Sequence, residues 1–267
     1  LPAKGDGQLL FMLNGLAKLK DDGQMAIIQN GSSLFNGDAG SGPSEIRRYL
    51  IENDWLDAIV QLPNNAFYNT GIATYIWLVM KNKPVTHQGK VQLIDASNCA
   101  SSRRKNIGLK NVDITKACRD LIVKAYGAYV DETYKGIEEN GNAIIVKSKV
   151  MDSVDLGYNK IVVETPQFDE NGNVMMKKNK LMVDTSKRDT ENVPLAEDID
   201  AYFEREVIPY NPHAWVDKSK TKVGYEIPFT RTFYEYKKIE PSGVIAARIE
   251  EHEKGLMAKL HELFGGE

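Results

Sequence analysis

The first part of the chain alternates between helical and strand-like patterns of apolar residues. Between Gly7 and Lys20 the apolar residues recur every three or four positions, which predicts an amphipathic helix. The short apolar run Gln24–Gln29 predicts a buried strand. A second helix is expected to begin near Pro43, because proline is favoured in the first turn of a helix. This alternation is typical of α/β folds.

Two further apolar runs, Leu56–Leu62 and Tyr75–Met80, are separated by a polar loop. A parallel return would need a crossover of about a dozen residues or more, and the Pro63–Ile72 loop is too short and too polar for one. We therefore expect the two runs to form an antiparallel pair of buried strands. The loop would hold the aromatic pair Phe67 and Tyr68 at the rim of the sheet.

One more strand and one more helix are predicted before the character of the sequence changes. Val91–Asp95 is typical of a strand, and a helix is expected from Asp113 to Tyr126 with Asp113 as its N-cap. These elements fit an α/β fold, namely the C-terminal half of a doubly wound, Rossmann-like sheet with an antiparallel hairpin at its edge. The first half has no counterpart, and the chain begins at Leu1 without an initiating methionine, so we expect a fragment.

Beyond residue 136 the pattern indicates a mixed α+β extension. Tyr158–Thr165 and Val174–Val183 predict strands, and the Asn171-Gly172 pair between them favours a hairpin turn. We therefore expect two domains. Residues 1–135 would form the sheet domain, and residues 136–267 would form an extension that binds a partner subunit.

A long helix is predicted from Ser242 to Phe264. Its apolar residues fall on one stripe, which includes Ile245, Ile249, Leu256, Leu260 and Leu263. A stripe of this length, flanked by charged residues, is typical of helices that pack against a partner. Packing of the stripe against the chain's own domain remains an equal alternative.

Composition narrows the possible functions. The chain has 267 residues and a formal net charge of −3, which does not favour binding of nucleic acid through bulk charge. Any DNA affinity must be local or come from a partner, and Arg103, Arg104 and Lys105 form the densest basic group. They would either contact phosphates or lie in a solvated loop. No apolar run could span a bilayer and no signal peptide is evident, so we expect a cytoplasmic protein without a membrane partner.

No metal site or independent hydrolase site is expected. Cys99 and Cys118 lie in unrelated segments, and the four histidines show no ligand spacing. The glycine-rich segment with Gly37, Gly40 and Gly42 follows a strand and precedes a helix, as phosphate-binding loops do. However, its glycines are not in the dinucleotide-binding order, so a surface loop is the favoured interpretation.

Four ordered blocks carry a family resemblance. They are QMAIIQNGSSLF, EIRRYLIENDWLDAIVQLPNNAFYNTGIATYIWLVMKNK, KVQLIDAS and GYEIPFTRTFYEY, the last followed by the long terminal helix. Together they resemble the modification (M) subunit of type I restriction-modification systems, the HsdM family of N6-adenine DNA methyltransferases. The blocks cover most of Gly7–Ser97 and Gly224–Phe264. The resemblance implies that the sheet belongs to a class I methyltransferase domain.

The resemblance implies methyl transfer from S-adenosylmethionine to adenine N6 in double-stranded DNA. The partners implied are a specificity (S) subunit, which reads the DNA sequence, and a restriction (R) subunit for cleavage. The target adenine is flipped out of the duplex, because its N6 cannot be reached inside the stack. By position, the aromatic residue that stacks on this base is Phe67, with Tyr68, Asn69 and Thr70 beside it. The terminal helix would dock on the S subunit.

Two motifs of the family have no match. The Asn/Asp-Pro-Pro-aromatic motif, which accepts hydrogen bonds from the adenine amino group, is absent because the sequence has no Pro-Pro pair. Asn211-Pro212 is the nearest imitation and is expected to be a turn. The glycine-rich turn and acidic residue that hold the methyl donor are also unmatched. We therefore expect no catalytic residue, no bound S-adenosylmethionine and no methylation by the fragment alone.

Two other interpretations stay open. The chain would be a non-catalytic assembly module that binds protein or the DNA backbone, or it would be part of a fused restriction-modification enzyme in which methylation and recognition share one chain.

Overall fold

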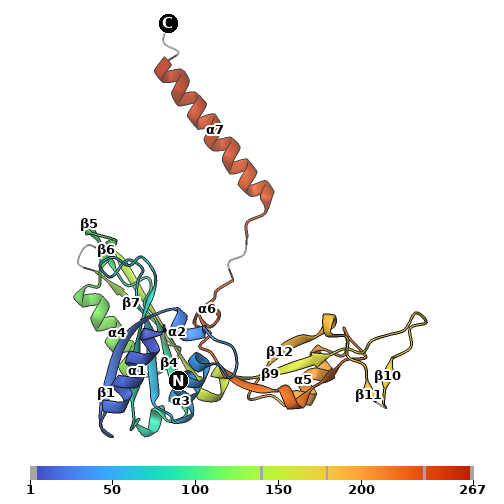
Figure 1. Ribbon diagram of the computed structural model, residues 1–267. Helices are drawn as coiled ribbons and strands as arrows, with labels where there is room; N and C mark the ends of the chain where they lie inside the picture. The colour runs from blue at the N-terminus through green and yellow to red at the C-terminus, as the bar shows by residue number, and fades with distance from the viewer. Residues whose placement is uncertain (1–4, 139–140, 179, 237–238, 265–267) are drawn as a thin grey trace. The chain divides into compact units, whose positions relative to one another are not determined.

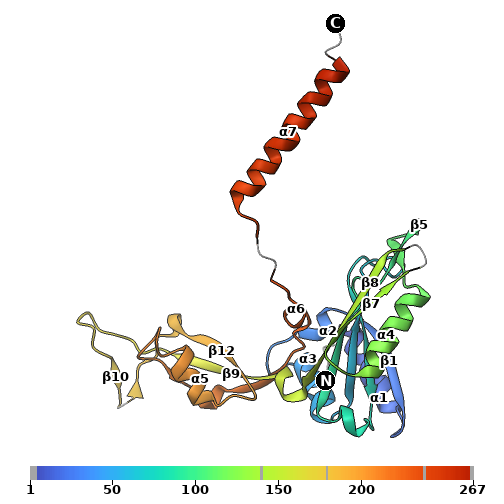
Figure 2. The ribbon, with the colours of Figure 1, turned by 180° about the vertical axis from the view of Figure 1, so that it is seen from behind.

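The computed structural model describes residues 5–138, 141–178, 180–236 and 239–264. The chain divides into two units, residues 1–233 and 234–267. The larger unit contains a six-stranded sheet with helices on both faces, and a smaller four-stranded sheet (Figures 1 and 2).

The six-stranded sheet has the strand order β1-β3-β2-β4-β8-β7. Its strands are β1 (Gln24–Asn30), β2 (Leu56–Gln61), β3 (Thr74–Met80), β4 (Lys90–Asp95), β7 (Glu132–Ile137) and β8 (Ala143–Asp152). Strands β2 and β4 are parallel, and the other neighbouring pairs are antiparallel. The predicted α/β class and the antiparallel β2–β3 pair are confirmed. Because β1 covers the outer side of β3, that pair lies inside the sheet rather than at its edge.

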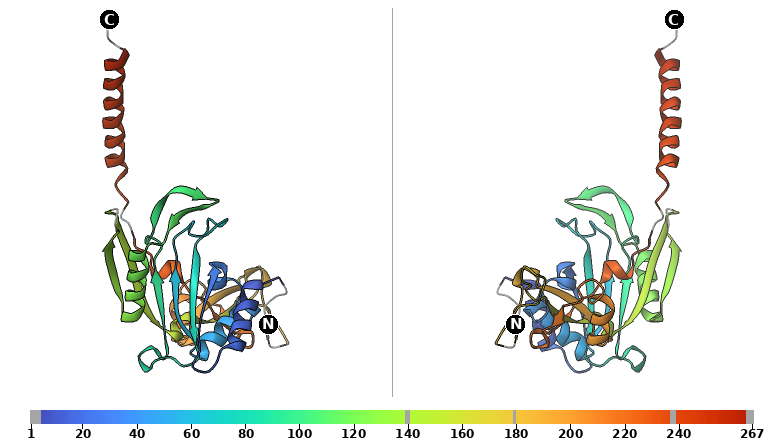
Figure 3. Two further views of the ribbon diagram at one scale, coloured as in Figure 1. Left: turned by 90° about the vertical axis from the view of Figure 1, so that its left-hand side faces the viewer. Right: turned by 90° about the vertical axis from the view of Figure 1, so that its right-hand side faces the viewer.

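Helices cover both faces of this sheet. They are α1 (Gly7–Lys18), α2 (Ser32–Phe35), α3 (Gly42–Glu52) and α4 (Lys116–Ala128). Successive side chains of a strand point to opposite faces, so alternate residues enter two separate cores. Ile59 and Leu93 join the core shared with α1 and α3, whereas Val60 and Ile94 join the core shared with α4. Figure 3 shows these helices on opposite sides of the strands.

The predicted start of α3 is confirmed, whereas the predicted start of α4 is wrong. Pro43 lies in the first turn of α3, as predicted. Helix α4, however, begins after Thr115, whose hydroxyl accepts a hydrogen bond from the Cys118 amide at 3.3 Å. The predicted N-cap Asp113 is wrong, because that residue lies in strand β6 (Lys110–Asp113).

The basic segment expected as a loop is also a strand. Ser101–Ile107 forms β5, which pairs antiparallel with β6 in a two-stranded hairpin. Its sequence is polar and lacks the apolar alternation that marks a half-buried strand. The hairpin therefore depends on its turn and on contacts with neighbouring segments rather than on a buried face.

The six-stranded sheet continues past the domain boundary expected after residue 135. That boundary falls inside β7, where Lys135 pairs with Ile145 of β8. Strand β8 in turn pairs with β4 and buries Ile144, Val146 and Ser148 on one side. The sheet domain therefore reaches Asp152, because the alternating apolar positions of β8 belong to its core.

The four-stranded sheet is built around one strand. Strand β9 pairs antiparallel with β12, β13 and β14, and α5 packs over the core that contains Ile161 and Phe203. These elements are β9 (Gly157–Glu164), β12 (Asp189–Pro194), β13 (Trp215–Val216), β14 (Lys222–Tyr225) and α5 (Ile199–Glu206). A turn forms at Asn171-Gly172, with Gly172 at φ 80°. The predicted hairpin is wrong, however, because β9 pairs with β12 rather than with the segment Val174–Val183. Beyond it lie the short strands β10 (Met176–Lys177) and β11 (Lys180–Leu181), and helix α6 (Phe229–Thr232) follows β14.

Arg47 of α3 connects the two sheets. Its side chain is only 1% exposed, and its guanidinium donates hydrogen bonds to the carbonyl oxygens of Tyr225 at 2.6 Å, Ser33 at 3.1 Å and Asn36 at 2.9 Å. The hydroxyl of Ser44 accepts a further bond from the Tyr225 amide at 2.9 Å. Burial lowers the pKa of Arg47 to about 10. The end of β14 is thus held to α3 by a buried cation.

The smaller unit contains helix α7 (Ser242–Phe264), as predicted. A single helix has no surface on which to bury its own apolar stripe. Within the described ranges, no helix is long and apolar enough to cross a membrane. The same ranges hold no cluster of three or more His, Cys, Asp or Glu residues that could bind a metal ion.

Candidate functional site

The parallel strands β2 and β4 end at the same edge of the six-stranded sheet, where the segments that follow them meet. The first is residues 63–73, here named the rim loop. The second leads into the β5–β6 pair, here named the rim hairpin, which projects beyond this edge of the sheet (Figures 1 and 3). In open α/β sheets, ligands bind outside the carboxyl ends of the parallel strands. This edge is therefore the candidate site.

The rim loop has a constrained backbone. At its base the Leu62 amide donates to the Thr74 carbonyl at 2.8 Å. Asn65 and Asn69 both have φ 57°, a left-handed conformation that asparagine tolerates better than most residues. A bridge between Phe67 and Thr70 closes the centre of the loop into a tight turn. The loop therefore presents its aromatic pair from a defined turn.

The two aromatic side chains of the rim loop differ in burial. Phe67 is half-buried and packs against the core beneath α4, whereas Tyr68 is 64% exposed. The packing of Phe67 fixes the ring while leaving part of it accessible. An anchored and partly exposed ring is suited to stacking against a planar ligand.

The rim hairpin is docked on the rim loop. The Asn111 amide donates to the Asn65 carbonyl at 3.2 Å. Gly108, in the hairpin turn, has φ +57°, and a Cβ atom there would lie 2.9 Å from both the Tyr68 ring and Asn69 Oδ1. Only glycine satisfies this backbone and this close approach together. The loop and the hairpin therefore form one surface.

The three basic residues predicted to contact DNA divide into two kinds. Arg103 is half-buried and forms an ion pair with Asp113, which Lys110 also approaches at 3.1 Å. The hydrogen bond from Arg103, followed by that from Lys110, lowers the pKa of Asp113. Arg104 and Lys105 are exposed, and neither side chain forms an ion pair with a described residue. The last two are thus the basic side chains available to a ligand.

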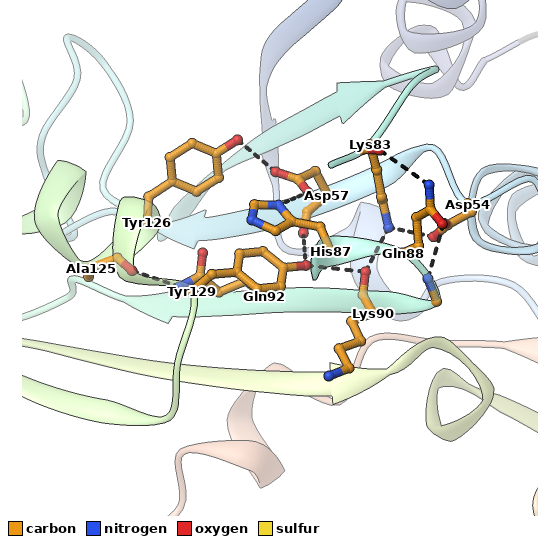
Figure 4. Close-up of polar contacts among 11 residues, drawn as sticks. Asp54, Asp57, Lys83, His87, Gln88, Lys90, Gln92, Ala125, Tyr126 and Tyr129 are labelled. Atoms are coloured by element: carbon orange, nitrogen blue, oxygen red, sulfur yellow. Dashed lines mark hydrogen bonds and ion pairs between the residues drawn. The ribbon is translucent and has the colours of Figure 1, made fainter. Parts of the chain in front are cut away.

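A buried polar cluster lies at the opposite edge of the sheet (Figure 4). Asp57 is completely buried at an irregularity where β2 shifts register against β3. Its carboxylate lies 2.9 Å from His87 Nδ1 and accepts a hydrogen bond from the Tyr126 hydroxyl at 2.6 Å. Burial, and then this hydrogen bond, raises the pKa of Tyr126. The ring of Tyr129 stacks on His87 with centroids 3.5 Å apart.

The same cluster holds the connection between β3 and β4. Lys83 is buried, and its ammonium donates to Asp54 Oδ1 and to the Lys90 carbonyl, each at 2.6 Å. The second oxygen of Asp54 accepts from the Gly89 amide at 3.0 Å. Figure 4 shows these contacts beside the Asp57 group. Because its polar groups contact one another, the cluster is best explained as a structural feature that holds β2, β4 and α4 together.

Replacing Asp57 with alanine is expected to lower the free energy of unfolding by about 2–3 kcal/mol, because the half-buried side chains of Tyr126 and His87 lose their acceptor. Urea denaturation followed by circular dichroism measures this change. Asp120 serves as the control, since it is exposed on α4 and, among the residues that the structure describes, forms an ion pair only with Lys116. Equal losses for Asp57→Ala and Asp120→Ala would show that the cluster adds no stability.

Sequence reasoning missed this cluster and the role of Arg47. A carboxylate inside the apolar run Leu56–Leu62 was the available signal for Asp57, since an unpaired charge is not tolerated in such a position. His87 carries no recognisable spacing motif, because its partner is the carboxylate of a strand that is distant in the sequence. Arg47 has no local signal at all, because the carbonyl of Tyr225 lies 178 residues away.

The glycine-rich segment before α3 does not form a phosphate cradle. Gly37 and Gly40 have φ 88° and 76°, so the turn depends on glycine. Asp38 between them pairs with Lys160 of β9 at 2.8 Å, and a Cβ on Gly40 would lie 3.5 Å from the Lys222 side chain. The hydrogen bond from Lys160 lowers the pKa of Asp38. The loop packs against the second sheet, and its acidic residue disfavours an anionic ligand.

Comparisons with known proteins identify relatives of the sheet domain. The chain is 32% identical over 109 residues to the type I restriction enzyme MjaIX methylase subunit of Methanocaldococcus jannaschii. The matched region covers 40% of this chain and 19% of that subunit. It is 32% identical over 117 residues to the MpnII methylase subunit of Mycoplasma pneumoniae, covering 43% of this chain and 20% of that subunit. The chain thus matches about a fifth of the length of these relatives.

A solved structure shows a weaker likeness. The type I restriction-modification system methyltransferase subunit from Streptococcus thermophilus superimposes with a TM-score of 0.47 at 26% identity, covering 58% of this chain and 29% of that one. Residues 1–155, more than half of the chain, match the N-6 DNA Methylase family. The chain belongs to the N-6 DNA Methylase family.

Proposed function

We propose that this chain supplies the base-holding rim of the methylase subunit of a type I restriction-modification enzyme. The enzyme would transfer a methyl group from S-adenosylmethionine to N6 of adenine in double-stranded DNA, in a complex with S and R subunits. The observation that carries the proposal is Phe67, a half-buried ring on a constrained loop at the carboxyl ends of β2 and β4.

The work assigned to this chain is to bind and orient the base. An adenine that leaves the duplex loses its stacking partners, and an aromatic ring that receives it restores about 1–3 kcal/mol of stacking free energy. Phe67 is fixed from behind by the core and so need not be ordered when the base arrives. Tyr68, Asn69 and Thr70 lie beside it in the same turn, where they would border the base.

The methyl donor has no fitting site among the described residues. The Gly37–Gly42 segment is packed against Lys160 and Lys222, and the polar group around Asp57 lies at the opposite edge of the sheet. We therefore assign no step of methyl transfer to groups of this chain, and expect the chain alone to be inactive. Residues outside it would hold S-adenosylmethionine and accept the hydrogen bonds of the adenine amino group.

The identity of the product tests the proposal. A subunit that contains this sequence and the donor-binding region is assembled with its S subunit and incubated with DNA and S-adenosylmethionine, and the nucleosides are separated by mass spectrometry. We expect N6-methyladenine, and only when the S subunit is present. Methylcytosine, or no methylated base, would contradict it; activity without an S subunit would favour the fused-enzyme interpretation.

The apolar stripe of α7 is proposed to dock on the S subunit. Leu256→Asp together with Leu260→Asp should abolish co-purification with the S subunit, because two carboxylates would be buried in an apolar interface. The control is Glu253→Ala with Glu262→Ala, which removes charge from the same helix without altering the stripe. Undiminished co-purification of the Leu256/Leu260 variant would show that the stripe packs elsewhere.

A further inference from the structure

The tip of the rim hairpin carries apolar residues that bury little. Ile107 ends β5 and pairs with Lys110, so Gly108 and Leu109 form a two-residue turn. Ile107 is 49% exposed and Leu109 is 56% exposed. Hairpin turns normally carry glycine, asparagine, aspartate or serine, so a leucine in the turn is unexpected. Because the rest of β5 is polar, hydrophobic burial does not explain this tip.

The exposed apolar side chains of the tip have neighbours of the same kind. Tyr68 of the rim loop contacts the turn at Gly108 and is itself 64% exposed. Ile72, in the same loop, is 57% exposed. Scattered exposed apolar residues are ordinary, whereas a group of them at one functional edge indicates a binding surface.

Charge identifies the partner that this surface fits. The exposed side chains of Arg104 and Lys105 lie on the same strand as Ile107, three and two residues before it. The chain as a whole has a net charge of −3, so these two cations stand out locally. Basic side chains beside exposed apolar and aromatic ones are typical of surfaces that contact nucleic acid. A two-stranded ribbon also has dimensions that a DNA groove admits.

We propose that Ile107 and Leu109 form an apolar wedge that enters duplex DNA and fills the space left by the extruded base, while Arg104 and Lys105 contact the flanking phosphates. Extruding a base leaves its neighbours unstacked, at a cost of a few kcal/mol. Apolar side chains that occupy the gap offset part of this cost. The inference rests on the proposed function, because it requires a base to have left the stack.

The connection between hairpin and loop gives the wedge its position. The Asn111–Asn65 hydrogen bond and the Gly108–Tyr68 contact fix the tip relative to the turn that carries Phe67. The same surface would then bind the base outside the duplex and fill the gap that the base leaves in the stack. Holding the base depends on Phe67, and filling the gap depends on Ile107 and Leu109. The two roles are therefore separable by mutation.

Binding of this chain to two labelled duplexes tests the wedge. One duplex is intact and the other has a single abasic site, which provides the gap without extrusion; fluorescence anisotropy at low ionic strength gives both affinities. We expect the abasic duplex to bind about 5–10-fold more tightly. In Ile107→Ser/Leu109→Ser this preference should fall to about 1, with the affinity for the intact duplex changed less than about twofold.

Two control variants separate the wedge from charge and from general surface change. Arg104→Gln/Lys105→Gln should weaken binding to both duplexes equally and reduce the salt dependence, leaving the preference unchanged. Val85→Ser/Val123→Ser removes two exposed apolar side chains from other places, 83% and 66% exposed, and should change nothing. Because all these positions are exposed, unchanged thermal unfolding is the expected check on folding.

An unchanged preference for the abasic duplex in the Ile107/Leu109 variant would overturn the wedge. So would an unaltered chain that binds both duplexes equally, or one that binds no DNA. Loss of S-subunit binding in that variant with the preference intact would instead make the tip a protein contact. Phe67→Ala should leave the abasic preference unchanged. The failure of base stacking and the failure of the wedge are therefore distinguishable.

Discussion

Arg47→Ala should lower the free energy of unfolding by about 3–5 kcal/mol, the largest loss of stability expected for a single substitution in this chain. The guanidinium donates to three carbonyl oxygens, the buried ones of Ser33 and Tyr225 and the partly buried one of Asn36. Each buried acceptor that loses its partner costs about 1–3 kcal/mol, reduced where water can enter the space left by the side chain. Equilibrium denaturation in urea measures the effect.

The neighbouring residue provides a matched control. Arg48, whose side chain is 38% exposed, lies on the same helix and pairs with Glu52 at 2.9 Å, four residues away. Surface pairs of this kind contribute about 0.3–0.5 kcal/mol, so Arg48→Ala should have little effect. Arg47→Lys should fall between the two, because a single ammonium cannot reach three carbonyls in the geometry of a planar fork. If Arg47→Ala stayed within about 1 kcal/mol of Arg48→Ala, the buried cation would not hold the sheets together.

Phe67→Ala should reduce methyl transfer by the assembled enzyme about 10–100-fold, which corresponds to the loss of about 1–3 kcal/mol of base stacking. Phe67→Tyr should retain most of the activity because its ring still offers a flat face. Co-purification with the S subunit should not change, because the rim loop and α7 belong to different units of the chain. Single-turnover methylation of a cognate duplex measures the rate.

Phe35 is the control for this experiment. It is 59% exposed at the end of α2, so Phe35→Ala removes an aromatic ring without disturbing the rim loop. Methylation by Phe67→Ala at the rate of the unaltered enzyme would contradict the stacking role. A fall shared by Phe35→Ala would indicate a general loss of folding instead.

The parts of the fold that the sequence predicted were those in which local pattern and burial agree. The β2–β3 pair was predictable because the rim loop is too short for a crossover, and α3 because Pro43 marks its first turn. The α4 start was missed because Asp113 and Thr115 are both good N-caps, and the choice depends on the pairing of β5 with β6. Pairing of that kind is a tertiary effect that propensity does not contain.

The candidate site was predictable in its position but not in its surroundings. Phe67 could be located on a loop between two apolar runs, and its role was inferred from a family resemblance. The docking of the rim hairpin could not be inferred, because β5 is polar and the Asn111–Asn65 contact joins separate segments. The domain boundary was placed too early for a similar reason, since Glu132–Ile137 is too polar to be recognised as a strand without its partner β8.

The most direct test of the base-holding role is the fluorescence lifetime of 2-aminopurine at the target position of a duplex bound to the assembled enzyme. A base stacked on an aromatic ring is quenched, whereas an extruded base without a partner is bright and long-lived. We predict a short-lifetime population of extruded base with Phe67 present and its replacement by a long-lifetime population in Phe67→Ala. Identical lifetime distributions for the two proteins would show that Phe67 does not hold the adenine.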